Sequence, residues 1–147
     1  MKYFVLISIL ILSGCTSTPK VISDSDITST MNLIALTEEA APAGIKGVFK
    51  LSIKAAGIQN SGIYLNTELD YRDRRNVSVA IHPRTVNAFI KKYGTSPDLY
   101  FINKTVEVTG EAKRMIIDFY AMGKKTGKYY FQTHINITSL NQIKVLD

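Results

Sequence analysis

The chain has 147 residues, of which 46% are hydrophobic and 20% are charged. This length and balance fit one globular domain and argue against a disordered chain. Lysine and arginine number 18 against 12 acidic residues, which gives a formal net charge of +6. The single cysteine excludes an intrachain disulfide and a zinc site made of several cysteines, and the two histidines disfavour a histidine-rich metal site. We therefore expect neither a metal nor a cofactor.

The N-terminal segment combines one basic residue, Lys2, with an apolar run from Tyr3 to Leu12. These ten residues would span only ~15 Å as a helix, about half of a ~30 Å hydrocarbon core. A short apolar run behind a positive charge is typical of a secretory signal peptide. We expect residues 1–14 to be removed from the mature chain.

The apolar run ends in the four residues Leu12-Ser13-Gly14-Cys15. A branched apolar residue and two small residues before the only cysteine resemble the lipobox of bacterial lipoproteins. The resemblance covers residues 1–15 and implies diacylglyceryl transfer to the Cys15 sulfur, cleavage after Gly14 and acylation of the new amino terminus. Two or more acyl chains suffice for stable membrane anchoring. A free thiol behind an ordinary signal peptide is the alternative interpretation.

The residue after Cys15 bears on location, because an aspartate there tends to retain enterobacterial lipoproteins at the inner membrane. Thr16 is compatible with sorting to the outer membrane, on the side that faces the periplasm. The stretch from Thr16 to Ser29 is rich in serine, threonine and aspartate, which is typical of a flexible tether. We expect a signal peptide over residues 1–14, a lipidated cysteine with a tether and short helix over 15–43, and a folded domain over 44–147.

The first half of the folded part predicts a short helix and three strands. Met31 to Ala41 suits a short helix that Pro42 ends. Apolar residues then alternate with polar ones from Val48 to Ala56, from Ile63 to Glu68 and from Asn76 to His82. This period of two is expected of strands with one buried face.

The second half predicts a helix and two strands. Pro83 starts a helix whose apolar stripe contains Phe89, and Gly94 suits its C-terminal cap. Ser96-Pro97-Asp98 indicates one further helical turn.

The fourth strand is predicted from Thr105 to Phe119, with a bulge or sharp bend at Gly110. The fifth strand follows from Tyr129 to Thr138, and the tail from Ile143 to Leu146 forms a closing segment.

This order, β-β-β-α-β-β, predicts an all-β domain with one helix, folded as a five-stranded OB-fold-like Greek-key barrel. The run from Asn103 to Glu111 is similar to the fourth strand of many OB modules, and the stretch from Tyr64 to Val79 is similar to a segment of uncharacterised secreted OB-like domains. That resemblance implies no established activity. SH3-like barrels and small sandwiches lack an obligatory helix at this point.

OB-folds commonly bind ligands on strands two and three, between the loops that join strands 1–2 and 4–5. Basic side chains interleaved with aromatic rings suit phosphates and bases, and also anionic sugars. Because alternate strand residues point inward, we expect Tyr129 and Phe131 to lie in the core. The candidate ligand residues of this region are Tyr64, Lys124, Lys125, Lys128 and Tyr130.

The densest charge lies in Asp70 to Arg75, and we expect its aspartates to neutralise arginines across a turn. Arg74 and Arg75 remain candidates for binding phosphates or carboxylates.

No catalytic motif is present, so we expect no enzymatic activity. His82 and His134 are expected to be partly exposed strand residues. A carboxylate group of Glu68, Asp70 and Asp73 would suit a nuclease or hydrolase, but a solvated turn fits their spacing better.

These features together predict a lipid-anchored, periplasm-facing binding module that contacts an envelope protein or polymer. The alternative is a protein that binds single-stranded nucleic acid or an oligosaccharide. A periplasmic address makes chromosomal DNA an improbable ligand, whereas nucleic acid taken up or scavenged outside the cytoplasm fits that location.

Overall fold

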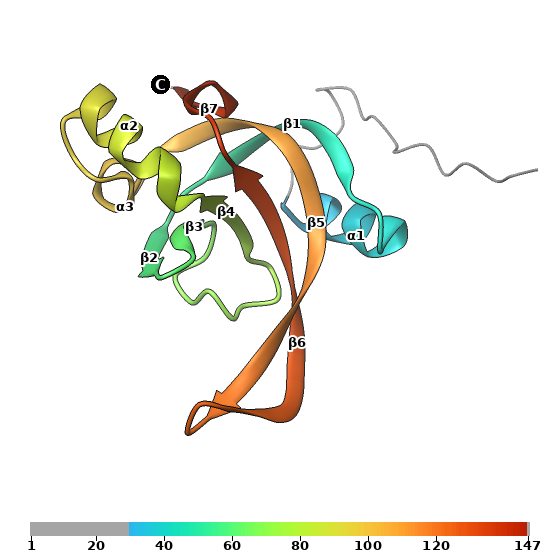
Figure 1. The fold of residues 1–147 in the computed structure, drawn as a ribbon. Coiled ribbons are helices and arrows are strands. Elements are labelled where there is room, and N and C mark those ends of the chain that lie inside the picture. The colour runs from blue at the N-terminus through green and yellow to red at the C-terminus, as the bar shows by residue number, and fades with distance from the viewer. Residues whose placement is uncertain (1–29, 147) are drawn as a thin grey trace, which may run out of the picture.

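The computed structural model describes residues 30–146 (Figure 1). The predicted signal peptide, the predicted lipidation site Cys15 and the predicted tether all lie outside these residues. Within them no helix is long and apolar enough to cross a membrane. The helices are α1 (Thr30–Ala40), α2 (Pro83–Tyr93), α3 (Pro97–Tyr100) and the 3-10 helix η1 (Leu140–Gln142). The strands are β1 (Ile45–Ser52), β2 (Ala55–Gln59), β3 (Gly62–Asn66), β4 (Val77–Ile81), β5 (Thr105–Ala121), β6 (Lys124–Ile137) and β7 (Ile143–Leu146).

The fold is mostly β, as predicted, but its strands number seven rather than five. They form one mixed sheet in the order β1-β5-β6-β4-β3-β2, with β7 paired to β5. The β4–β6 pair is parallel and the other pairs are antiparallel. The closing tail predicted after Ser139 is β7.

The additional strand in the first half arises because the chain changes its partner at Ile53 and Lys54. The Ile53 amide donates to the Lys104 carbonyl oxygen at 2.9 Å, and the Lys54 amide donates to the Asn66 carbonyl oxygen at 2.9 Å. β1 therefore lies along β5, while β2 lies along β3. The alternation from Val48 to Ala56 persists across the change, so the sequence pattern does not reveal it.

β5 also changes partner along its length. It pairs with β1 as far as Ala112 and with β6 from Ala112 onward. The bulge predicted at Gly110 is wrong, because the pairing register is continuous there and shifts between Asp118 and Tyr120 instead. At Gly110 a Cβ would lie 3.0 Å from the Ile135 Cγ2 atom, so glycine permits close packing between strands.

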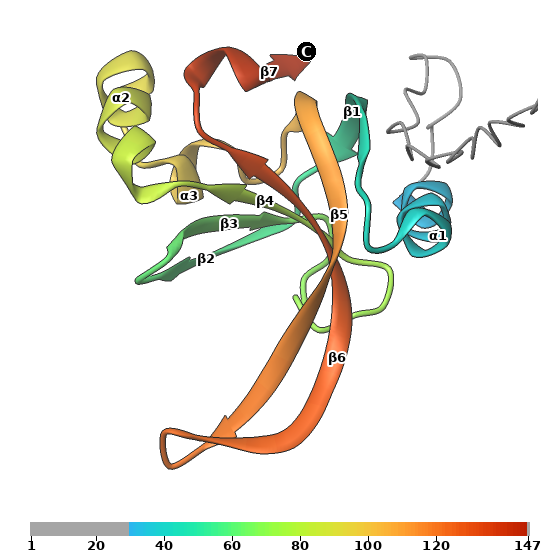
Figure 2. The same cartoon turned by 45° about the vertical axis from the view of Figure 1, so that its right-hand side comes forward.

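Residues 115–132 of β5 and β6 pair only with each other, because the β4–β6 pairing ends at Thr133. We call this two-stranded hairpin the arm. Figures 1 and 2 show it projecting from the sheet, away from α2 and α3. Both of its faces reach solvent over much of its length, and residues 119–129 are all exposed.

The core lies between the curved sheet and the helices that cover it. α1 contributes the fully buried Leu33, and its buried Thr37 shares a 3.0 Å hydrogen bond with Thr133 of β6. α2 contributes the fully buried Phe89, which packs against Phe101. The other buried hydrophobic side chains of the core cluster are Phe49, Leu51, Ile53, Ile63, Leu65, Val77, Val79, Ile81, Val106, Val108, Ala112, Ile135, Ile137 and Ile143.

The helix predicted after the third strand is confirmed as α2. The His82 ring nitrogen Nδ1 accepts a 3.2 Å hydrogen bond from the Arg84 amide at the N-terminus. Gly94 ends the helix at φ 75°, a left-handed conformation that glycine adopts without steric cost. Phe89 is the buried residue of this helix, whereas the neighbouring Ile90 is 40% exposed.

Candidate ligand-binding site

Two hollows flank the base of the arm. The larger one, the arginine groove, has a volume of about 500 Å³. The smaller one, the polar cleft, has a volume of about 270 Å³. Tyr130 and Gln132 of β6 line both hollows, so a single extended ligand can reach from one to the other.

The arginine groove brings three guanidinium groups together with aromatic rings. Arg72 and Arg74 come from the loop between β3 and β4, and Arg114 comes from β5. The rings come from both strands of the arm, and α1 closes one side. The remaining lining residues are Ile34, Glu38, Phe119, Tyr129, Tyr130, Phe131, Gln132 and Thr133.

Arg114 is held in place by two neighbours. Its guanidinium carbon lies 3.6 Å from the centre of the Phe131 ring, and its Nη2 lies 3.5 Å from the Glu38 carboxylate. Its Nε atom is buried and has no hydrogen-bond partner in residues 30–146. A buried donor without a partner is costly, so this position of Arg114 is maintained by its contacts with Phe131 and Glu38.

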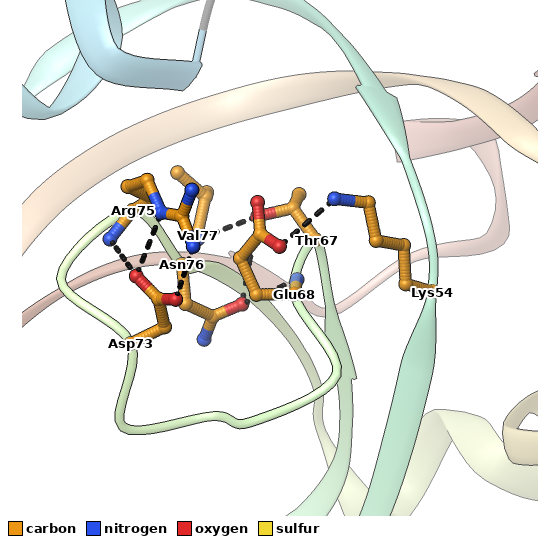
Figure 3. A network of polar contacts seen from close by, with 7 residues as sticks. All are labelled: Lys54, Thr67, Glu68, Asp73, Arg75, Asn76 and Val77. Atoms are coloured by element: carbon orange, nitrogen blue, oxygen red, sulfur yellow. Dashed lines mark hydrogen bonds and ion pairs between the residues drawn. The ribbon is translucent and has the colours of Figure 1, made fainter.

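The loop over residues 67–76 that carries Arg72 and Arg74 is anchored by the buried Asn76. Its Nδ2 donates to Asn66 Oδ1 at 3.1 Å, to the Tyr71 carbonyl oxygen at 3.2 Å and to Ser78 Oγ at 3.0 Å. Its Oδ1 accepts from the Glu68 amide at 3.2 Å, as Figure 3 shows. The loop therefore presents its arginines from a fixed base.

The aspartates of this loop serve its turns, as predicted. Asp73 forms an ion pair with Arg75 at 2.7 Å (Figure 3). Asp70 accepts a hydrogen bond from the Arg72 amide at 2.9 Å. Hydrogen bonds from the Arg75 side chain and backbone lower the pKa of Asp73 to about 2. Arg75 is thus engaged within the loop and does not line the groove, whereas Arg74 does.

The three carboxylates considered for hydrolysis each have a separate partner. Glu68 pairs with Lys54 at 2.8 Å (Figure 3). Asp70 and Asp73 instead bond to groups within the loop. Among residues 30–146 no group of histidine, cysteine, aspartate and glutamate side chains could hold a metal ion.

The polar cleft has an uncharged floor. Ser78, Asn66 and Gln132 are all at least nine-tenths buried there. His134 lies beside them, and its ring packs 5.8 Å from the Tyr64 ring. Burial lowers the pKa of His134 from 6.5 to about 4, so the ring is neutral at pH 7.

The lysines predicted as ligand residues lie at the tip of the arm, away from both hollows. Lys125 pairs with Asp118 at 2.6 Å, and the hydrogen bond to that carboxylate raises the pKa of the lysine. Lys124 and Lys128 are exposed and line neither hollow. The predicted set is therefore divided, with Tyr64, Tyr130 and Arg74 at the hollows and the other members apart from them.

One further expectation about the site region needs correction. Tyr129 and Phe131 are 57% and 40% exposed rather than core residues, because no second layer from residues 30–146 covers the arm. His134 is a partly exposed strand residue, as expected, and Gln132 and Tyr64 contact it. Sequence analysis missed Arg72, Arg114 and Gln132, whose importance depends on contacts between distant segments that no local motif indicates.

Comparisons with known proteins give no sequence match. No protein-family model matches the chain, and no curated protein matches it. Aspartyl-tRNA synthetase from Entamoeba histolytica is similar in structure over 74% of this chain and 20% of that one, with 15% identity and a TM-score of 0.44. A putative aspartyl-tRNA synthetase from Leishmania major Friedlin is similar over 94% of this chain and 22% of that one, with 8% identity and a TM-score of 0.44. The chain spans about a fifth of the length of these synthetases.

Proposed function

We propose that this chain is a non-enzymatic binding protein for single-stranded nucleic acid and that the arginine groove is its main contact surface. The observation that carries the proposal is the meeting of Arg72, Arg74 and Arg114 with the rings of the arm in one groove. Guanidinium groups bind phosphate oxygens in a forked geometry, and aromatic rings stack on bases. Single strands expose both groups together, whereas a duplex hides the faces of its bases.

The topology supports this assignment as an OB-fold. If β1 and β2 are taken as one bent strand, five strands remain in the body of the sheet, and β7 is an addition. The bent strand pairs with β5 through its first half and with β3 through its second half, so it joins the two ends of the sheet. Helix α2 follows β4, and β4 runs parallel to β6. These pairings support a partly open Greek-key barrel, a fold in which the faces of strands two and three and the adjoining loops bind oligonucleotides and oligosaccharides.

The lipobox-like sequence supports an envelope location for this activity. We propose that Cys15 carries the lipid and that the protein faces the periplasm from the outer membrane. Its ligand would then be nucleic acid outside the cytoplasm. Substitution of Cys15 by serine should release the protein from the membrane fraction and abolish labelling by a radioactive fatty acid. Persistence of the label in the variant would contradict the anchor.

The binding proposal is tested by fluorescence polarisation of a labelled single-stranded oligonucleotide over a range of salt concentrations. The double variant Arg72→Ala/Arg74→Ala should bind at least about tenfold more weakly, because it removes two phosphate contacts. The slope of log affinity against log salt should fall by about 1.4, since each phosphate contact on a single strand contributes ~0.7.

The matched control removes two positive charges from another surface. Arg84 and Lys91 are exposed on α2 and line neither hollow. The variant Arg84→Ala/Lys91→Ala should keep the affinity and the slope of the wild type. Equal losses in both double variants would indicate a diffuse charge effect and would contradict the groove. Binding of a sulfated oligosaccharide but not of the oligonucleotide would favour the glycan alternative.

A further inference from the structure

We propose that the polar cleft is a separate subsite that takes one unpaired nucleobase, with Asn66 and His134 hydrogen-bonding to its edge. This inference rests on the proposed function, because it assigns a second part of the same ligand. The cleft lies between β2, β3 and the arm, and its volume of about 270 Å³ is close to the lower end of small-molecule sites. It therefore suits one heterocycle and its sugar.

Asn66 supplies an unused donor in this cleft. Its Oδ1 accepts from Asn76 Nδ2 at 3.1 Å and from Ser78 Oγ at 2.7 Å, which fixes the orientation of the amide. Its Nδ2 has no hydrogen-bond partner among residues 30–146. The residue lines the cleft and is 5% exposed, so an acceptor on a ligand in the cleft would give this amide its missing partner.

His134 supplies the complementary acceptor. Gln132 donates through Nε2 to the Tyr71 carbonyl oxygen, so its Oε1 faces His134 Nε2 at 2.7 Å. An amide oxygen only accepts, so the proton of the neutral ring lies on Nε2. Nδ1 is then a free acceptor, and no donor from residues 30–146 bonds to it.

The remaining walls fit an uncharged ring rather than a phosphate. None of the residues that line the cleft is a lysine, arginine, aspartate or glutamate. Tyr64 and Tyr130 provide aromatic surface, and Ile58, Leu69 and Ile117 provide apolar surface. Every nucleobase offers a donor and an acceptor on one edge and a flat face for stacking.

The two hollows would thereby bind different parts of one nucleotide. The groove offers three guanidinium groups for the phosphates, whereas the cleft offers uncharged groups for the base. Tyr130 and Gln132 line both, so the sugar would cross the base of the arm at these two residues.

A comparison of two probes with equal charge separates the two sites. A short oligothymidylate and an abasic oligomer of the same length carry the same phosphates, but only the first carries bases. The full chain should bind the oligothymidylate about tenfold more tightly than the abasic oligomer, since one base contact of this kind changes affinity by roughly that factor.

A cleft-filling variant tests where this preference arises. A Cβ on Gly57 would meet no atom within 4 Å, and Gly57 pairs with Tyr64, so a side chain there enters the cleft on the tyrosine's side. Gly57→Leu should lose the preference for bases and keep the affinity for the abasic oligomer. Asn141→Leu, which adds the same side chain at an exposed position of η1 that lines neither hollow, should keep both affinities.

Titration with thymidine, which carries no phosphate, gives a direct measure of the cleft. The amide resonances of Gly57 and the side-chain amide of Asn66 should shift in the wild type and not in Gly57→Leu. If the wild type binds both oligomers equally, the cleft proposal is wrong while the proposed function stands. If the wild type binds neither oligomer, the proposed function is itself wrong.

Discussion

At the scale of single residues, the arginines divide by whether a partner within the protein already engages them. Arg75 makes an ion pair with Asp73 at 2.7 Å inside its own loop. Arg114 keeps a buried Nε that has no hydrogen-bond partner among residues 30–146, although its charge lies over the Phe131 ring. Neighbouring positions in the sequence do not distinguish these cases. Arg74 and Arg75 are equivalent candidates by sequence, but only the first lines the groove.

His134 should make the fold weaker in mild acid. Its pKa is 6.5 in an unfolded chain and about 4 in the fold, because burial disfavours the charged ring. As pH falls from 6.5 to about 4, the unfolded chain gains a proton that the fold does not accept. The free energy of unfolding should fall by up to ~3 kcal/mol across this window.

Chemical denaturation of the wild type and His134→Gln across this pH range provides the measurement. In the variant, the free energy of unfolding should no longer fall by this amount between pH 6.5 and about 4, whatever its value at neutral pH. The lowered pKa of Asp73 acts between 3.8 and about 2, where protonation removes its stabilising ion pair, so the two effects fall in different windows. If the free energy of unfolding changes equally with pH in both proteins above pH 4, the pKa of His134 is not lowered by the fold.

At the scale of elements, two glycines on the β2–β3 hairpin differ in whether a side chain would fit at their positions. Gly62 has a φ of 136°, and a Cβ there would overlap the Ile81 carbonyl oxygen of β4. Gly62→Ala should therefore lower the free energy of unfolding by about 3 kcal/mol or more. Gly57→Ala, at an unobstructed position of the same hairpin, should change it by no more than ~0.5 kcal/mol. Urea denaturation compares the two, and similar losses would contradict the close approach at Gly62.

The elements also show how far local patterns in the sequence can predict this fold. Period-two alternation located β3 and β4 to within two residues, and the cap signals located α2, because each depends on neighbours in the chain. The predicted strand from Tyr129 to Thr138 matches the end of β6 but misses its start at Lys124. The same alternation placed Tyr129 and Phe131 in the core, because a pattern indicates two faces but not whether a layer covers either one. The change of partner at Ile53 and Lys54 depends on Lys104 and Asn66, which are far away in the sequence.

The candidate site, too, could be predicted only where it depends on local sequence patterns. Tyr64 and Tyr130 could be selected from the alternation and from the expected ligand face of the barrel. Arg72, Arg114 and Gln132 could not, because the groove forms only when α1, the β3–β4 loop and the arm come together. Lys124, Lys125 and Lys128 of the basic tip are close in sequence but line neither hollow.

At the scale of the whole molecule, the outer part of the arm should be separable from the fold. Residues 119–128 are all exposed, and Asp118 pairs with Tyr129 just before them. Replacing residues 119–128 by Asn-Gly, which suits a two-residue hairpin turn, should change the free energy of unfolding by less than ~1 kcal/mol.

This shortened protein should bind oligonucleotides more weakly, because Phe119 lines the groove. It should still prefer bases over abasic sites, because Ile117 and Tyr130 of the cleft remain. Thermal denaturation measures the change in stability, and the polarisation assay measures the affinities for the oligonucleotide and the abasic oligomer. Loss of cooperative unfolding would show that the arm supports the sheet, contrary to this account.

The pairing of β1 with β5 has a consequence for the order of events during synthesis. Ile45 pairs with Ala112, so the first strand has no partner until most of the chain has been made. The parallel pairing of β4 with β6 waits still longer. Sheets built from such distant segments fold slowly, because the long loop must close before any contact is gained. For the proposed lipoprotein, slow pairing of these strands would keep the chain unfolded while it is exported across the membrane.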